Sequence, residues 1–162
     1  MLAHKLALDA FDDQPFKLFA IHCSLEDYRM AFLLNKHLNI NLTRSRKDVD
    51  FLLRSAPVLF ALYRFEDLQR YCCYYLISNK SRSQVRSGAI EGSLFGEEGF
   101  DIKDAHLFPE LKNVDFFLKI EEDHNAVSEK ELLEKIKGIP QIATAYLVGE
   151  EQIKTKQNLI FE

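Results

Sequence analysis

The chain has 162 residues, 47% of them hydrophobic, a size and composition typical of one domain with a sizeable core. Its formal net charge is −4, with acidic and basic residues interspersed, whereas nucleic-acid-binding proteins usually carry a basic excess. Its apolar runs fall short of the roughly 20 residues that span a bilayer, and the N-terminus lacks a signal-peptide pattern. We therefore expect a single cytoplasmic domain over residues 1–162, without membrane contact.

The three cysteines, Cys23, Cys72 and Cys73, fit neither a CxxC pair nor the spacing of zinc ligands. Free cysteines are among the most buried residue types, and reduced thiols are usual in the cytosol. The sequence therefore predicts three reduced thiols in or near the core, with no disulfide, metal or cofactor.

Two strands are predicted at the start of the chain, over residues 4–10 and 16–23, with a turn at Pro15 between them. Both faces of the second strand are largely apolar, which is typical of a strand inside a sheet. The short connection predicts an antiparallel hairpin. Ser24 is then expected to cap a helix whose apolar residues recur at helical spacing through Leu38.

The next segments predict further strands. Residues 41–53 mix charged and apolar side chains and predict two extended pieces joined by a polar turn at 45–47, at an edge of the sheet. Residues 58–65 and 70–78 are rich in aromatic and β-branched side chains, which suit a pleated surface. They predict a hairpin.

Residues 79–106 hold four of the six glycines and predict one long Gly-rich loop that begins basic and ends acidic. Loops of more than about 12–15 residues inside a compact domain usually carry function or remain disordered. We therefore expect a partner-binding surface here, with Phe95 and Phe100 as apolar anchors.

Residues 114–121 alternate with a period of two, which predicts a half-buried strand. The face expected to pack on the helices comprises Val114, Phe116, Leu118 and Ile120. A second helix is expected to begin at the cap Ser128, with Glu131 completing a capping box, and to end at Gly138.

A strand over residues 142–148 and a last short strand at 159–161 complete the predicted elements. Together they predict an α+β fold with a mostly antiparallel sheet and both helices packed on one face. The order of the strands is left open.

Catalytic patterns are absent from the sequence, which has no Gly-rich phosphate-binding motif, no HExxH and no GxSxG, so an enzyme is the less favoured class. Glu110 and Asp115, beside the rigid Pro109, form a candidate clamp for a ligand or partner. The structural alternative is that Glu110 accepts backbone N–H groups near Pro109 while Asp115 lies on the solvent face of its strand.

A group of eight cations has two readings. In the first, these side chains neutralise the phosphates of RNA while nearby tyrosines stack on its bases. In the second, they form a solvated edge of the sheet that discourages aggregation. The group comprises Arg44, Arg46, Lys47, Arg64, Arg70, Lys80, Arg82 and Arg86.

The segment Phe108-Pro109-Glu110-Leu111-Lys112-Asn113-Val114-Asp115-Phe116 resembles the I-P-E-x-x-x-V-D-Y signature of the bacterial IPExxxVDY family. Phe108 and Phe116 stand where the signature has Ile and Tyr, and the other four positions match. The chain length, the strand-rich start and the Ile139-Pro140…Ala145-Tyr146 segment are also similar to the family. The resemblance implies a small cytosolic bacterial protein. It transfers no catalytic residue, because the family has no assigned activity.

These observations predict a non-catalytic protein-interaction module whose partner is another protein or a second copy of the same chain. The candidate binding residues are Pro109, Glu110, Asp115, Phe95 and Phe100. The alternative is an RNA- or nucleotide-binding accessory protein that uses the cationic group.

Overall fold

A computed structural model describes residues 15–53, 56–86, 100–124, 126–154, 156–159 and 161. The strands are β1 (Phe16–His22), β2 (Thr43–Arg44), β3 (Val49–Leu53), β4 (Ala56–Phe60), β5 (Leu62–Asp67), β6 (Cys72–Ser78), β7 (Lys80–Arg86), β8 (Phe100–His106), β9 (Phe116–Glu122) and β10 (Thr144–Leu147). The helices are α1 (Asp27–Leu38) and α2 (Glu129–Lys137), and the short 3-10 turns are η2 (Pro109–Leu111), η3 (Glu150–Gln152) and η4 (Lys156–Leu159).

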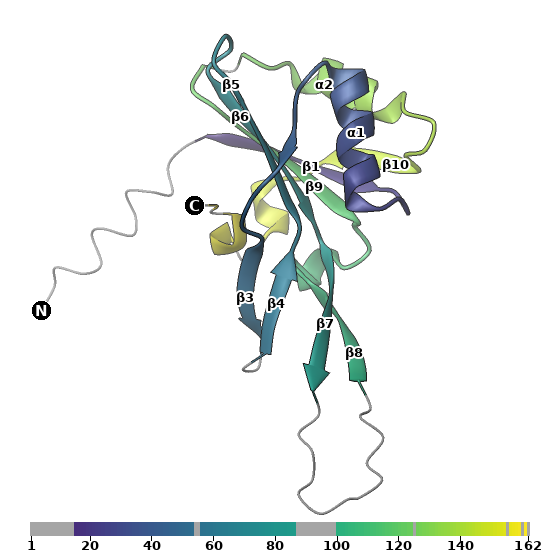
Figure 1. The fold of residues 1–162 in the computed structure, drawn as a ribbon. Coiled ribbons are helices and arrows are strands. Elements are labelled where there is room, and N and C mark those ends of the chain that lie inside the picture. Colours follow the sequence, from purple (N-terminus) through teal and green to yellow (C-terminus); the bar gives the residue numbers. More distant parts are fainter. Residues whose placement is uncertain are drawn as a thin grey trace, which may run out of the picture.

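The centre of the fold is a six-stranded antiparallel sheet in the order β10-β1-β9-β6-β5-β2. β3 pairs with β4 and β7 pairs with β8 in two separate ribbons that extend from one end of the sheet (Figure 1). The α+β class and the mostly antiparallel sheet predicted from the sequence are confirmed.

β1 and β9 lie in the interior of the sheet, because each pairs on both sides. Phe19 of β1 lies opposite Leu147 of β10 on one side and Leu118 of β9 on the other. The prediction that the strand from Phe16 is an interior strand is therefore confirmed. The first predicted strand, over residues 4–10, lies outside the described residues.

Both helices pack on the same face of the sheet, as predicted (Figure 1). Met30 and Leu34 of α1 and Ile136 of α2 are completely buried in one apolar cluster with Leu118. Burial of a leucine or isoleucine side chain stabilises a fold by roughly 1.5–3 kcal/mol, so this layer is a principal source of stability.

β9 directs alternate side chains to the two faces of the sheet. Phe116, Leu118 and Ile120 reach the helix-side cluster, which confirms that part of the prediction. Val114 was predicted on the same face and is instead buried in the opposite cluster. The prediction is wrong for Val114 because this residue precedes β9 and does not follow its alternation. Its N–H donates instead to the Leu111 carbonyl of the η2 turn, at 3.0 Å.

The predicted cap residue is correct for one helix and wrong for the other. Ser128 caps α2, its hydroxyl accepting from the Glu131 N–H as expected. Ser24 does not cap α1, because the first helical residue is Asp27 and the capping position belongs to Glu26, whose side chain makes no capping hydrogen bond.

The predicted strand over residues 58–65 is two strands in the structure. β4 pairs with β3 in a ribbon, whereas β5 pairs with β6 in the sheet, which confirms the hairpin in its second half. The chain changes partner at Ala61, whose carbonyl accepts the Ser78 N–H at 3.1 Å. β2 lies at the edge of the sheet, as predicted.

The predicted loop over residues 79–106 is wrong at both ends. β7 and β8 pair from Lys80 opposite His106 to Arg86 opposite Phe100. Pairing satisfies the backbone groups of these two flanks, and the four glycines of the predicted loop lie between them in the sequence. Phe95 and the rest of residues 87–99 lie outside the described residues.

The face of the sheet away from the helices carries a second apolar cluster that includes Leu18, Tyr75 and Phe117. The final segment covers part of it, with Leu159 buried there. The predicted last strand at 159–161 is therefore wrong, because η4 is a 3-10 turn that packs on the face of the sheet instead of extending its edge.

Candidate functional site

Asn79 is a completely buried amide that organises the segment singled out in the sequence. Its Nδ2 donates to the carbonyls of Leu111 (2.9 Å) and Val114 (2.8 Å), and its Oδ1 accepts the Phe108 N–H (3.0 Å). Its own backbone N–H donates to the Asp115 carbonyl at 2.9 Å. One side chain therefore fixes both ends of the 108–116 segment.

Asp115 is held at the end of β1. Its Oδ2 accepts the Cys23 N–H at 2.8 Å, and its Oδ1 forms an ion pair with the Lys80 ammonium at 2.8 Å. The Asp115 N–H in turn donates to the Ile21 carbonyl at 3.1 Å. The carboxylate thus joins β1, the start of β7 and the segment before β9.

Glu110 does not share this position. Its Oε1 accepts the Lys154 N–H at 2.9 Å, so it binds a backbone donor of the final segment of the chain. Pro109 is the first residue of η2 and is exposed. The structure therefore does not bring Glu110 and Asp115 together in one clamp. Glu110 does accept a backbone N–H, but this N–H belongs to Lys154 and not to a residue next to Pro109, and Asp115 precedes its strand and bonds Cys23 and Lys80.

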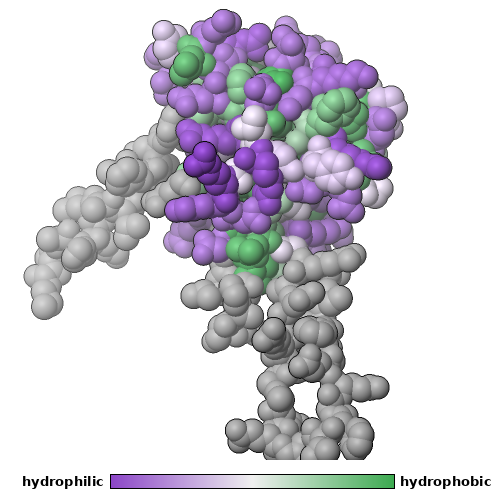
Figure 2. All heavy atoms as spheres, in the orientation of Figure 1, coloured by the Kyte–Doolittle hydropathy of each residue, from purple (hydrophilic) through white to green (hydrophobic). Residues whose placement is uncertain are grey.

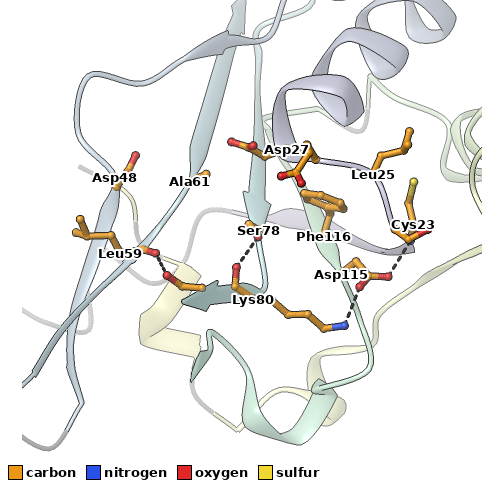
Figure 3. Close-up of a pocket in the computed structure, with 13 residues that line it drawn as sticks. Cys23, Leu25, Asp27, Asp48, Leu59, Ala61, Ser78, Lys80, Asp115 and Phe116 are labelled. Carbon is orange, nitrogen blue, oxygen red and sulfur yellow. Dashed lines mark hydrogen bonds and ion pairs between the residues drawn. The ribbon is translucent and has the colours of Figure 1, made fainter. Parts of the chain in front are cut away.

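Asp115 instead lines a cavity of about 560 Å³ at the start of α1. Figure 3 shows the cavity between α1 on one side and Asp48 and Leu59 on the other, with Lys80 reaching toward Asp115 across its base. We call this cavity the α1 groove. Its lining comprises Cys23, Ser24, Leu25, Glu26, Asp27, Asp48, Leu59, Ala61, Ser78, Lys80, Ser81, Asp115 and Phe116.

The α1 groove is acidic, since four carboxylates and one lysine line it. Arg44 forms an ion pair with Asp48 from outside the lining, and Lys80 pairs with Asp115. Two carboxylates remain without a cationic partner among the described residues, those of Glu26 and Asp27.

Asp27 accepts a hydrogen bond from the Tyr63 hydroxyl at 3.1 Å. Burial of the Tyr63 ring, together with the negative charge of Asp27, raises the pKa of that phenol to about 12. Tyr63 therefore stays a neutral donor at physiological pH.

The predicted cationic group is divided between the two faces of the sheet. The Arg44 guanidinium lies over the ring of Tyr63, which belongs to the helix-side cluster. Arg64 lies over the ring of Tyr75, which belongs to the opposite cluster. Arg70 lies 3.9 Å from Asp67 at the β5–β6 turn.

Lys80 lies at the α1 groove, where it pairs with Asp115, and Arg46 and Lys47 are exposed between β2 and β3. Arg82 and Arg86 lie on β7, and Phe100 lies on β8. The cations for which side chains are described therefore form no single basic surface.

Sequence reasoning named Asp115 and Lys80 but missed the other residues that build this site. Asn79 follows a strand and carries no motif, and Glu26, Asp27 and Asp48 are separated in sequence from Asp115 and Lys80. The pairing of β9 with β1 and with β6, and of β2 with β5, brings them together.

A search of protein-family models and of curated proteins finds no match for this chain. Within the part of the chain that the structure describes, no three His, Cys, Asp or Glu side chains are placed to hold a metal ion. Among the same residues, neither helix is long and apolar enough to cross a membrane.

Proposed function

We propose that this chain is a small protein-interaction module, and that the α1 groove receives a basic side chain of its partner. One observation carries the proposal: the groove presents the carboxylates of Glu26 and Asp27, which have no cationic partner among the described residues, across from Leu59, which is 54% exposed (Figure 3). A lysine or arginine side chain fits this combination, because its charged end pairs with carboxylates and its methylene stem packs on an apolar neighbour.

The surface around the α1 groove favours a partner that binds through charged groups and not through a broad apolar area. Figure 2 shows that hydrophobic surface on this face is broken into small patches, one of them where the ribbons leave the body. Partner proteins that bind through a continuous apolar patch usually need a larger one. The resemblance to the IPExxxVDY signature is consistent with a non-catalytic role and names no partner.

The alternative, RNA or nucleotide binding, receives less support. RNA-binding surfaces combine a continuous basic track with aromatic rings on which bases stack. Here Arg44 and Arg64 lie over rings in opposite clusters, and each has a carboxylate partner, Asp48 and Glu66 respectively.

The test begins with the intact chain as bait for proteins of its own lysate, identified by mass spectrometry. Calorimetric titration of the captured partner then compares the wild-type chain with Glu26→Gln and Leu59→Ser. We expect each variant to weaken binding several-fold, and Glu26→Gln to reduce the dependence of Kd on salt, because it removes a charge.

Glu134→Gln is the matched control, since it removes the same charge from an exposed position of α2 outside the groove. If Glu26→Gln and Leu59→Ser bind like the wild type, the groove is not the binding surface. A salt-dependent mobility shift with bulk RNA, in the absence of any captured protein, would favour the alternative.

A further inference from the structure

Lys119 is a nearly buried cation on the face of the sheet away from the helices. Only 5% of its surface is exposed. Its ammonium donates to the Glu121 carboxylate and to the Leu159 carbonyl, the latter at 2.7 Å. Removing an ammonium group from water is costly unless such partners replace the lost hydration.

Three aromatic rings complete the surroundings of this ammonium. It lies 5.3 Å from the ring centre of Phe16, 5.6 Å from that of Tyr75 and 5.3 Å from that of Phe161. Rings at these distances attract a cation through their negative faces. Lys119, Glu121, Phe16 and Tyr75 therefore form a receptor, which we call the Lys119 cage.

Two of the cage's contacts come from the last part of the chain, residues 150–154, 156–159 and 161, which we call the strap. Leu159 supplies the carbonyl, and Phe161 supplies a ring that also lies 5.3 Å from the Tyr75 ring. Figure 1 shows the strap on the other side of the sheet from α1 and α2. It shares no residue with the α1 groove.

The strap is attached differently from the strands. Elsewhere it is held by Lys154 N–H to the Glu110 carboxylate and by the Asn158 amide to the Leu107 carbonyl, both at 2.9 Å. Among the described residues outside helices and strands, the backbone–backbone hydrogen bond that joins residues 150–161 to the rest of the chain is a local one, from the Gln152 N–H to the Gly149 carbonyl at 3.0 Å. The strap can therefore separate while every ladder of the sheet stays intact.

Separation also returns the Lys119 ammonium to water, and this hydration offsets part of the contacts that are lost. Glu110, the residue expected in a partner clamp, is one of the strap's attachment points.

We propose that the strap is a releasable intramolecular ligand of the Lys119 cage. The cage accepts a peptide segment that presents a backbone carbonyl to the ammonium and an aromatic ring two residues later, as Leu159 and Phe161 do. A segment of another protein, or of a second copy of this chain, with the same spacing competes for the cage when the strap separates.

Hydrogen exchange of the full chain tests whether the strap separates and whether Lys119 holds it. In the wild type, the Lys154 amide and the amides of η4 are expected to exchange faster than those of β9, since local opening precedes global unfolding. Lys119→Met removes the charge and keeps an unbranched side chain that is one heavy atom shorter. It is expected to accelerate exchange in the strap about tenfold and to leave β9 and α2 unchanged.

Lys135→Met is the control, because it removes a lysine from an exposed position of α2. Equal strap exchange in Lys119→Met and the wild type would show that apolar packing alone holds the strap, which overturns the proposal. Strap exchange at the same rate as β9 in the wild type would also overturn it, since the strap would then open only with the whole fold.

A competition experiment tests the cage as a receptor. A synthetic peptide of residues 150–162 is titrated into the full chain carrying Phe161→Ala, with Phe161→Leu as a milder variant should the first fail to fold. We expect binding to both, and binding at least tenfold weaker when Lys119→Met is added. The proposal would be overturned if the peptide bound to neither folded variant. It would also be overturned if adding Lys119→Met left the affinity for the peptide unchanged.

Discussion

Asn79 shows how one amide can determine the path of a segment that follows it by some thirty residues. Its three side-chain hydrogen bonds satisfy one backbone N–H and two carbonyls of residues 108–114. Buried backbone groups without partners cost about 1–3 kcal/mol each. The segment that carries the family-like signature is therefore stable only with this side chain in place.

Asn79→Ala is expected to lower the free energy of unfolding by about 2–5 kcal/mol, since the Phe108 N–H and the Val114 carbonyl lose the amide and the Leu111 carbonyl keeps only the Val114 N–H. Asn79→Asp keeps the volume of the side chain and an acceptor for the Phe108 N–H, but it turns a carboxylate toward two carbonyls. It should lower the free energy of unfolding by as much as Asn79→Ala does. Urea unfolding measures both changes. A loss of less than about 1 kcal/mol for Asn79→Ala would show that water replaces the amide.

Tyr74 predicts a response of stability to alkaline pH. Its ring is buried against Phe65, and burial raises the pKa of its phenol to about 12 from 10.0 in the unfolded chain. The folded state holds this proton more tightly than the unfolded chain does. The resulting contribution of the Tyr74 phenol to the free energy of unfolding is therefore fully present below pH 10 and is lost as the pH rises through about 12.

Stability should therefore fall as pH is raised from about 8 to about 11, and Tyr74→Phe should reduce that fall by about 1 kcal/mol. Urea unfolding across this pH range, for both chains, measures the difference. Identical pH profiles of the two chains would mean that the phenol is not shielded from ionisation in the folded state.

At the scale of elements, the β5–β6 turn combines strain with exposure. Tyr71 has φ of 52°, in the left-handed region, although its side chain is 75% exposed and contributes little packing. A residue with a Cβ in that region costs roughly 1–2 kcal/mol. Asp67 stabilises the turn by accepting the N–H groups of Gln69 and Arg70.

Tyr71→Gly should raise the free energy of unfolding by about 0.5–1 kcal/mol, since glycine adopts this conformation freely and its greater freedom in the unfolded chain offsets only part of the gain. Leu68→Gly is the matched control, because Leu68 is equally exposed in the same turn without a positive φ. It should lower stability. Thermal unfolding of both variants measures the contrast, and a loss in Tyr71→Gly would contradict it.

The elements that the sequence predicts well are those with a local signal. Ser128 three residues before Glu131 predicts the start of α2, and the alternation from Phe116 to Ile120 predicts the faces of β9. Val114 has the same alternation, yet the η2 turn before it places it on the other face. Periodicity alone cannot indicate where a turn ends and the strand begins.

The α1 groove could not be predicted, because it depends on contacts between segments far apart in the sequence. Asp115 reaches the Cys23 N–H only because β9 lies beside β1. The sequence likewise contains each member of the Lys119 cage but no sign that they meet. Long-range pairing has no local signature of the kind that a helix cap or an alternating strand provides.

At the scale of the whole molecule, one sheet supports two apolar layers, so damage to either should destabilise both. Leu118 and Phe117 are adjacent, completely buried, and lie on opposite faces of β9. Replacing either by alanine is expected to cost about 2–5 kcal/mol, as large-to-small core substitutions do.

Far-UV circular dichroism and tyrosine fluorescence should report the same shifted transition for Leu118→Ala and for Phe117→Ala, because both layers share β9. Transitions that separate in either variant would mean that the two layers unfold independently. A loss below about 0.5 kcal/mol for Leu118→Ala would mean that the helix-side layer is not a core.

The position of β1 between β9 and β10 has a consequence for synthesis of the chain. A ribosome makes β1 before both of its neighbours, which come from residues 116–147. During translation Phe19 and Ile21 have no strand of their own sheet to pair with, and folding waits for the closure of a long loop. Until then the nascent chain carries an apolar strand with two open edges, a substrate of the kind that chaperones bind.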